Sequence, residues 1–377
     1  MVNYTPINAK TILTKHRFMD DWFLSKYGMN LYRGCEHACG YCDGRAEKYR
    51  VEGEFGEDVY VKVNAIELLK REIPKIKEKT FIFVGGGVGD SYQPAEKKFR
   101  LTRRTLELLK GFKFPIHILT KSSMVERDFD IIREINEQNG AIVSFSISSL
   151  ADDVWKTFEP GASPPAERFK SIEKFSDAGI PTGVMFIPQI PFLSDDKDSI
   201  RDVVKASREA GADFILYGGM TLKEGRQKEH FMRILKEKFP YLEDKYRGLY
   251  KNSGVWGSAA QGYYSRINRI TYDICREYKI PTRIPYKLFK DRIELKYEVA
   301  MILAHIGYFL EMQGKSGGAY KKASISIQKS PFDVRQKTLA GEGGLRKPPG
   351  VGKVIGGIVD EIVKERRCRL YGELSGC

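Results

Sequence analysis

Short apolar runs alternate with amphipathic segments through the first 217 residues of the chain. The apolar runs predict buried strands at residues 81–85, 115–120, 141–148, 183–187 and 213–217, after a first strand within residues 7–34. The amphipathic segments predict helices at 64–71, 101–110, 125–138, 165–178 and 199–210. We expect Asn64 to cap the first of these helices and Pro74 to end it. Six strand–helix units predict a parallel, right-handed, partly closed barrel, a partial (β/α)6 barrel of the TIM type.

The pattern changes in the last quarter of the chain. Two more helices are expected at 223–239 and 261–278, and from about residue 294 the sequence indicates helices joined by glycine-rich turns. A length of 377 residues with 42% hydrophobic content supports more than one core. We therefore expect two domains: residues 1–290, comprising an N-terminal leading segment and the α/β barrel, and residues 291–377, which are all-α.

The formal net charge of +14 favours a polyanionic partner, nucleic acid before membrane. No apolar run reaches the length of a membrane span, and the N-terminus lacks the apolar core of a signal peptide, so a cytoplasmic location is expected. Cys275, Cys368 and Cys377 are scattered, which fits a reducing compartment and argues against a disulfide framework.

The other three cysteines lie together in GCEHACGYC, residues 34–42, with the spacing C-x3-C-x2-C. Thiolates of Cys35, Cys39 and Cys42 can each bind one iron of a [4Fe–4S] cluster and leave the fourth iron without a protein ligand. Zinc is the alternative, but it wants a fourth ligand, and His37 lies inside the loop where it could complete a tetrahedron only with strain.

This motif resembles that of the radical S-adenosylmethionine (SAM) superfamily. The resemblance implies a partial barrel, SAM bound to the open iron, and an electron from a flavodoxin- or ferredoxin-type donor. Reductive cleavage of SAM then yields a 5′-deoxyadenosyl radical that abstracts hydrogen from an unactivated C–H bond. Tyr41 would place its ring against the cluster.

Five stretches in order resemble the spore photoproduct lyase-like group of DNA repair enzymes: NLYRGCEHACGYC, GDSYQPAE, LTKS, FEPGASPPAERF and GIPTGVMFIPQIPFLSD. A SAM site needs glycines for close backbone approach, polar groups, and an apolar shelf for adenine. The candidates are Gly85, Gly86, Gly87, Asp90, Lys121, Ser144, Ser146, Arg168 and Pro188. Lys121 and Arg168 would bind the SAM carboxylate, although each could equally be an ordinary surface cation, and the serines could pack against a helix.

Two features depart from that group. Asp43 follows the third cysteine where the group commonly has an aromatic residue, and no cysteine lies between Cys42 and Cys275. Spore photoproduct lyase returns a hydrogen atom through a cysteine in that interval. Here the hydrogen donor would have to be Cys275 or a tyrosine such as Tyr92.

The last 66 residues hold 13 Lys and Arg against 6 Asp and Glu, a net charge of +7 and half of the total. Residues 344–363 read as a helix-hairpin-helix whose turn, with Gly350 and Gly352, exposes backbone N–H groups to a phosphate. The segment is similar to the amino-terminal lyase domain of X-family DNA polymerases. That resemblance implies phosphate contacts at Tyr320, Lys321, Lys322, Lys329 and Lys353. The Schiff-base lysine of that polymerase domain aligns with Ile358, so we expect DNA binding without lyase chemistry. A helical interface or dimerisation module is the alternative.

Together these features predict a SAM-dependent enzyme of DNA repair or base modification. Because a base inside a duplex is out of reach of a barrel, the target base would be flipped. Modification of tRNA or rRNA, and an iron–sulfur DNA-binding protein that senses redox state, are the alternatives.

Overall fold

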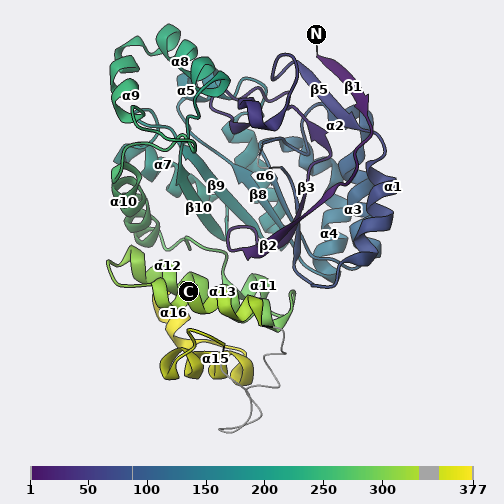
Figure 1. The fold of residues 1–377 in the computed structure, drawn as a ribbon, viewed down its shortest axis with the longest axis vertical. Coiled ribbons are helices and arrows are strands. Elements are labelled where there is room, and N and C mark those ends of the chain that lie inside the picture. Colours follow the sequence, from purple (N-terminus) through teal and green to yellow (C-terminus); the bar gives the residue numbers. More distant parts are fainter. Residues whose placement is uncertain (1, 87, 331–347, 376–377) are drawn as a thin grey trace.

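The computed structural model describes residues 2–86, 88–330 and 348–375. Its main sheet is seven-stranded in the order β10-β9-β8-β7-β6-β3-β2 and curls into a half-barrel (Figure 1). The strands are β2 (Leu13–Asp20), β3 (Ser25–Met29), β6 (Phe81–Val84), β7 (Ile116–Thr120), β8 (Ala141–Ser146), β9 (Thr182–Gln189) and β10 (Phe214–Gly219). All neighbours from β3 to β10 pair in parallel, and β2 pairs antiparallel at the edge. The predicted fold class is confirmed.

Helices follow the parallel strands. They are α1 (Ala65–Glu72), α2 (Ala95–Phe99), α3 (Leu101–Gly111), α4 (Phe129–Gln138), α5 (Asp152–Phe158), α6 (Pro165–Asp177), α7 (Lys197–Glu209), α8 (Arg226–Lys238), α9 (Glu243–Leu249), α10 (Tyr263–Glu277) and α11 (Tyr286–Phe289). Some of them lie on the outer face of the sheet and others, such as α8, beside the cysteine loop. Asn64 precedes α1 but its side chain makes no cap: the amide exchanges hydrogen bonds of 2.9 and 3.0 Å with the backbone of Ala9. The predicted cap is wrong because this tie to the N-terminal segment occupies the side chain.

A second, three-stranded sheet was not predicted. It consists of β1 (Asn3–Ile7), β5 (Asp58–Lys62) and the short β4 (Tyr32–Arg33), in the order β1-β5-β4. Gly34 leaves β4 with a φ of +82°, and a Cβ there would lie 2.4 Å from the carbonyl oxygen of Asp58. Only glycine fits this approach without strain, so the small sheet fixes the point where the cysteine loop begins.

The turn between β2 and β3 fills the end of the barrel where the parallel strands begin. Phe23 stacks on Phe83 with ring centroids 4.0 Å apart, and its carbonyl lies 3.2 Å from Nδ1 of the buried His117. Trp22 and Phe23 both line the cavity described below. The turn, which we call the floor of the barrel, therefore closes the end at which the parallel strands begin.

The described residues of the C-terminal segment form the helices α12 (Leu295–Met312), α13 (Gly318–Lys329), α15 (Lys353–Glu365) and α16 (Arg369–Ser375). They lie below the barrel in Figure 1, next to the end that carries the β2–β3 turn. The side chain of Tyr297 in α12 donates a 2.7 Å hydrogen bond to Glu78 of the barrel, and the largest hydrophobic cluster contains buried residues of both parts. The division into domains at residue 290 stays a prediction.

The turn from Pro349 to Gly352 and α15 match the second half of the expected helix-hairpin-helix, while its beginning lies outside the described residues. Within the part of the chain that the structure describes, none of the helices combines the length and apolar character needed to span a bilayer.

Candidate active site

The cysteine loop follows β4 and turns tightly at the ends of the barrel strands. The N–H of Ala38 donates to the carbonyl of Cys35, that of Cys42 donates to the carbonyl of Cys39, and that of Gly44 donates to the thiol sulfur of Cys42 at 3.3 Å. The three thiols are free and line the same cavity. Sequence reasoning placed these residues together correctly.

Burial keeps these thiols protonated in the absence of a metal. It raises the pKa of Cys39 to about 12, and it also raises the pKa of Cys35 and of Cys42. A bound cation must therefore displace the protons to create thiolates. Among the described residues, no group of three or more His, Cys, Asp or Glu side chains is arranged to hold a single metal ion.

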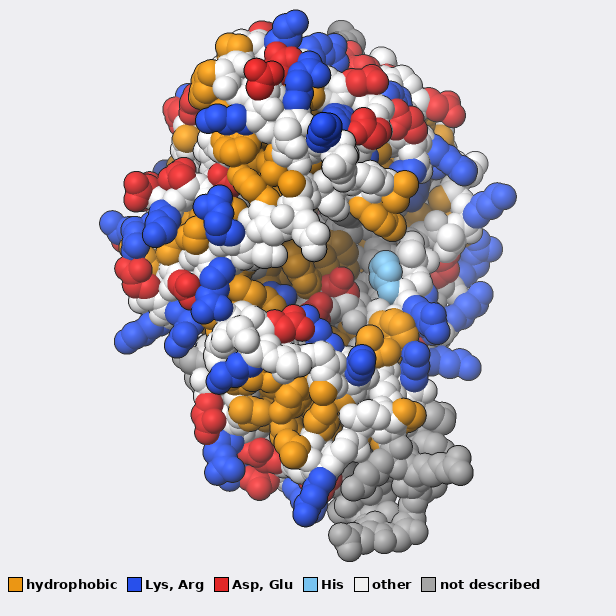
Figure 2. All heavy atoms as spheres, turned by 60° about the vertical axis from the view of Figure 1, so that its left-hand side comes forward, with side chains coloured by type: hydrophobic (Ala, Val, Ile, Leu, Met, Phe, Trp, Pro, Cys, Tyr) orange, Lys and Arg blue, Asp and Glu red, His pale blue; other side chains and the backbone are white. Residues whose placement is uncertain are grey.

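The cavity next to the thiols has a volume of about 410 Å³, within the range of small-molecule sites. Figure 2 shows a hollow on this side of the molecule with hydrophobic side chains in its depth and acidic and basic ones at its border. Its apolar walls come from the β2–β3 turn and from the ends of β7, β9 and β10: Trp22, Phe23, Leu119, Met185, Ile187, Pro188 and Met220.

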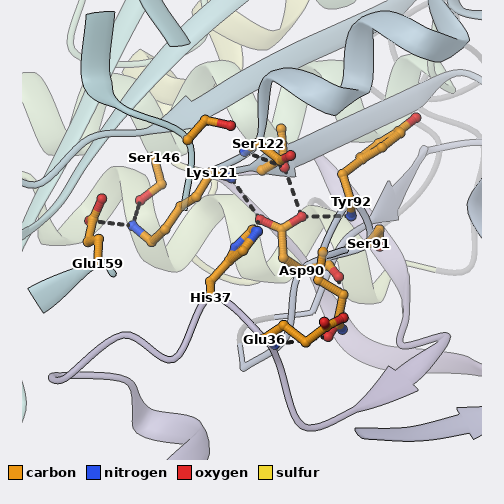
Figure 3. A network of polar contacts seen from close by, with 12 residues as sticks. Glu36, His37, Asp90, Ser91, Tyr92, Lys121, Ser122, Ser146 and Glu159 are labelled. Atoms are coloured by element: carbon orange, nitrogen blue, oxygen red, sulfur yellow. Dashed lines mark hydrogen bonds and ion pairs between the residues drawn. The ribbon is translucent and has the colours of Figure 1, made fainter. Parts of the chain in front are cut away.

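The carboxylate of Glu159 is the centre of a buried polar network between the cavity and α6. It accepts hydrogen bonds from Tyr41, from Ser148 at 2.7 Å and from Lys121 at 3.0 Å, and it pairs with Arg168 at 2.5 Å. Burial alone would raise the pKa of Glu159, but the two cations and the two hydroxyls hold it well below its usual range. In Figure 3 the ammonium of Lys121 reaches both Glu159 and Ser146, whose hydroxyl lies 2.6 Å away.

Asp90 joins three parts of the site. Its carboxylate accepts hydrogen bonds from the backbone of Tyr92 at 2.8 Å and of Lys121 at 2.7 Å, and from the Thr120 hydroxyl at 2.8 Å (Figure 3). The ring nitrogen Nδ1 of His37 lies 3.4 Å from it, near enough for an ion pair if the ring is protonated but too poorly aligned to count as a hydrogen bond. Burial would raise the pKa of Asp90, yet His37 and the backbone N–H groups lower it.

Asp43, the departure noted after the third cysteine, binds the barrel. Its carboxylate pairs with Lys223 at 2.5 Å and accepts hydrogen bonds from Thr221 at 2.8 Å and from Gln227 at 3.0 Å. Asp43 and Thr221 both line the cavity. An aromatic residue at this position could not make these contacts, so the acid locks the cysteine loop to the end of β10 and the start of α8.

The structure brings most of the predicted site residues together. The cavity is lined by Cys35, Cys39, Tyr41, Cys42, Gly86, Asp90, Lys121, Ser146 and Pro188. At Gly86 a Cβ would lie 1.7 Å from the side-chain oxygen of Asn30, so a larger residue there would displace the Asn30 side chain. Gly85 lies just outside the lining, next to Phe83 and Leu119, and Gly87 lies outside the described residues.

Two predicted cofactor contacts lie elsewhere. Ser144 shares the strand face of Ser146 but lies one step deeper, where its hydroxyl is 2.8 Å from the ring of the buried His117. Arg168 is fully buried behind the cavity wall, bound to Glu159 and to the carbonyls of Ser163 and Ser146. Both are corrections: their polar groups are satisfied inside the protein and do not line the cavity.

The two predicted hydrogen donors also lie away from the cavity. The Tyr92 ring is fully buried and points away from Asp90 (Figure 3). Cys275 is buried on the barrel-facing side of α10, and burial alone raises the pKa of its thiol far above the usual value. Neither side chain lines the cavity. These catalytic assignments are therefore corrected.

The predicted DNA contacts lie on the C-terminal helices. Lys321, Lys322 and Lys329 are exposed on α13, and Tyr320 is half-buried there. Gly350, with a φ of +83°, Gly352 and Lys353 are exposed at the start of α15. Lys321 pairs with Glu311 at 2.5 Å. Ile358 is buried.

Sequence reasoning missed Glu159 and His37 as members of the site, and it missed the contacts that Asp43 makes. Glu159 and Arg168 stand nine positions apart in FEPGASPPAERF, a stretch singled out for its resemblance but not for its carboxylate. His37 was considered only as a zinc ligand. The pairing of these residues depends on the packing of distant strand ends, for which the local sequence carries no signal.

The residues present fit the two cofactors that the motif implies. Three buried thiols on one wall supply the ligands of an iron–sulfur cluster. Beyond them the cavity is lined by the backbone of Gly86, the ammonium-bearing Lys121, and the apolar side chains of Ile187 and Pro188. This is the combination that an amino-acid group joined to a nucleoside needs.

Comparisons with known proteins agree with this site. The family model of the radical SAM superfamily matches residues 29–203. An uncharacterized protein of Mycobacterium tuberculosis is 30% identical over 230 residues, which cover 60% of this chain and 67% of that protein. An uncharacterized protein of Methanocaldococcus jannaschii is 30% identical over 209 residues, covering 55% of this chain and 75% of that protein.

Among solved structures, spore photoproduct lyase complexed with dinucleoside spore photoproduct is similar with a TM-score of 0.49 and 16% identity, over 70% of this chain and 77% of that one. A mutant of that lyase with bound AdoMet and the same dinucleoside gives the same TM-score, identity and coverage. TM-scores below 0.5 say nothing about the substrate of this chain. The family match assigns residues 29–203 to the radical SAM superfamily, whose members use a [4Fe–4S] cluster and S-adenosylmethionine.

Proposed function

We propose that this chain is a radical SAM enzyme that acts on DNA and removes a hydrogen atom from a base or a base lesion. The observation that carries the proposal is the attachment of a cationic helical segment to the barrel that holds the thiol cavity. Lys322, Lys329 and Lys353 are exposed on that segment, and none has a carboxylate within 4.0 Å among the described residues. Unpaired cations of this kind bind a phosphate backbone without reading sequence.

Within the cavity each group has a proposed task. The ammonium of Lys121 binds the SAM carboxylate, while Glu159 and Ser146 hold that ammonium in place. Gly86 lets the backbone approach the cofactor, and Pro188 borders the adenine. When bound, the cluster and SAM supply the 5′-deoxyadenosyl radical. A target base would have to leave the helix stack to reach the cavity.

The proposal does not include a thiol relay. Among the described residues, the cavity is lined by no cysteine besides Cys35, Cys39 and Cys42. Hydrogen return through a protein thiol, as in spore photoproduct lyase, would need one. We propose an external flavodoxin- or ferredoxin-type protein as the electron donor.

The test uses anaerobic, reduced, full-length enzyme with SAM and either UV-irradiated or undamaged DNA deuterated at the bases. The expected result is deuterium transferred from one base position into 5′-deoxyadenosine. RNA of the same sequence is the matched competitor, and transfer from RNA alone would replace the proposal with RNA modification. Absence of 5′-deoxyadenosine with either polymer would contradict the proposal and favour the iron–sulfur DNA-binding protein that senses redox state.

A further inference from the structure

We propose that the exposed edge strand β2, together with the end of α13, is a binding surface for a DNA strand that leads from the C-terminal helices to the cavity. The inference rests on the proposed function and names the surface that would bind the DNA strand. The surface comprises His16, Arg17 and Phe18 of β2 and Lys329 of α13, and we call it the β2 strip.

Two cations of the β2 strip gather at one aromatic ring. The guanidinium of Arg17 lies 5.2 Å from the ring centroid of Phe18, and the ammonium of Lys329 lies 5.5 Å from the same centroid. They come from positions 312 residues apart in sequence (329 minus 17). The contact is held by the N–H of Met19, which donates a 2.8 Å hydrogen bond to the side chain of Gln328. The fold therefore builds this pair of cations from β2 and α13.

Neither cation is neutralised by the protein. Within the described ranges, Arg17 and Lys329 have no carboxylate within 4.0 Å, whereas the neighbouring Lys15 pairs with Glu78 at 2.8 Å. Two unpaired cations beside an aromatic ring match the chemistry of a single nucleic-acid strand, whose phosphates bind cations and whose bases stack on rings.

The β2 strip also leads to the cavity. His16 is exposed, and its ring lies over Gly28 of β3 and beside Phe83. The ring of Phe83 in turn stacks on Phe23, which lines the cavity. The chain that leaves β2 supplies Trp22 and Phe23 to the same wall. Basic side chains, together with acidic ones, border the hollow in Figure 2. A strand held at Lys329 and Arg17 would thus be led towards the thiols.

The test compares the double variant Arg17→Gln/Lys329→Gln with the control Arg133→Gln/Lys205→Gln, in the full-length holoenzyme. The control removes the same charge from exposed positions on the outer helices α4 and α7. Binding of a fluorescein-labelled single-stranded DNA is measured by anisotropy over a series of salt concentrations. We expect the slope of log K against log salt to shrink by about 1.4 in the double variant, roughly 0.7 for each lost phosphate contact, and to change in the control by less than half of that. Phe18 replaced by a photo-crosslinking residue should attach to the same DNA.

Each outcome decides the matter. If the wild-type protein binds no DNA, the proposed function fails and the β2 strip fails with it. If the wild type binds DNA and cleaves SAM, but the double variant binds DNA like the control, the strip is overturned while the proposed function stands. Self-association of the double variant with unchanged DNA affinity would show that the charges only protect the free edge of β2. A loss confined to RNA would overturn the choice of DNA.

Discussion

The hydroxyl of Tyr41, inside the cysteine loop, donates a hydrogen bond to the carboxylate of Glu159, 118 residues further along the chain. The same carboxylate holds Lys121 on the cavity side and Arg168 on the buried side. One acid thus connects the metal-binding loop, the cofactor cavity and the helix behind it. Three of the predictions below concern this site.

Replacing Glu159 should lower the stability of the folded protein. Glu159→Gln leaves the guanidinium of the fully buried Arg168 without its counter-charge. Because an uncompensated charge remains inside, we expect a loss of about 3–5 kcal/mol in the free energy of unfolding. Anaerobic denaturant titration measures it. Glu173→Gln, an exposed change on α6, the helix that carries Arg168, is the control and should lie within about 0.5 kcal/mol of wild type. Equal stability of the two variants would contradict the role of Glu159 as the counter-charge of Arg168.

Lys121→Met should weaken SAM binding and leave most of the fold intact, because Glu159 retains Arg168, Tyr41 and Ser148 as partners. A charge-assisted hydrogen bond contributes roughly 1.5–3 kcal/mol, so the Kd for SAM should rise about 10- to 100-fold. Equilibrium dialysis of the reconstituted protein measures it. An unchanged Kd together with lower stability would show that Lys121 serves only Glu159.

The cysteines should separate into two groups by iron content. Cys39→Ala removes a cavity thiol and should lower iron and sulfide below the roughly four of each per chain expected for the wild type. Cys275→Ala changes a core position away from the cavity, so its iron content and SAM cleavage should match the wild type, with a stability loss of about 1 kcal/mol. Loss of SAM cleavage in Cys275→Ala at full iron content would restore this residue as a catalytic candidate.

The stability of the protein should fall in mild acid. Burial lowers the pKa of His117 from 6.5 to about 4, so the ring stays neutral in the folded state after it would have charged in the unfolded chain. The unfolded state then binds the additional proton, and the free energy of unfolding decreases as the pH falls from about 6.5 to about 4, by roughly 3 kcal/mol. Above pH 6.5 this group has no effect.

His117→Gln should remove that part of the pH dependence while a neutral side chain remains next to Ser144. The buried His305, whose pKa is likewise lowered to about 4 by burial, preserves a slope in the same pH range. Denaturant titrations from pH 7 to 4 test this. An unaltered pH profile in the variant would contradict the assignment.

Deleting residues 294–377 should unfold or aggregate the remaining chain instead of yielding a barrel that lacks DNA binding. Twelve of the 18 residues of α12 are buried, and Tyr297 and Tyr308 make hydrogen bonds to Glu78 and Tyr217 of the barrel. Size-exclusion chromatography and circular dichroism check this. The contribution of the helices to DNA binding is better measured with Lys322→Gln/Lys353→Gln, which changes exposed cations only.

The sequence predicted the parallel strands well because each is a short, buried apolar run followed by an amphipathic helix. It did not reveal β1, β5 and the edge position of β2, whose pairing partners are set by contacts across the fold. In the site, the cysteine spacing was sufficient for the three thiols. The prediction that Ser144 and Ser146 share one face of the strand was right. Periodicity does not encode depth in the barrel, however, so it did not show that Ser144 contacts His117 while Ser146 contacts Lys121.

The floor made by Trp22 and Phe23 has a consequence for the timing of a catalytic cycle. Because the turn closes that end of the barrel, S-adenosylmethionine and, under the proposed function, nucleic acid would reach the thiols through the same opening. S-adenosylmethionine would then have to bind before the nucleic acid covers the opening, and its cleavage products could leave only after the nucleic acid dissociates. Departure of the nucleic acid, more than the radical chemistry, would then limit how often the enzyme can be used.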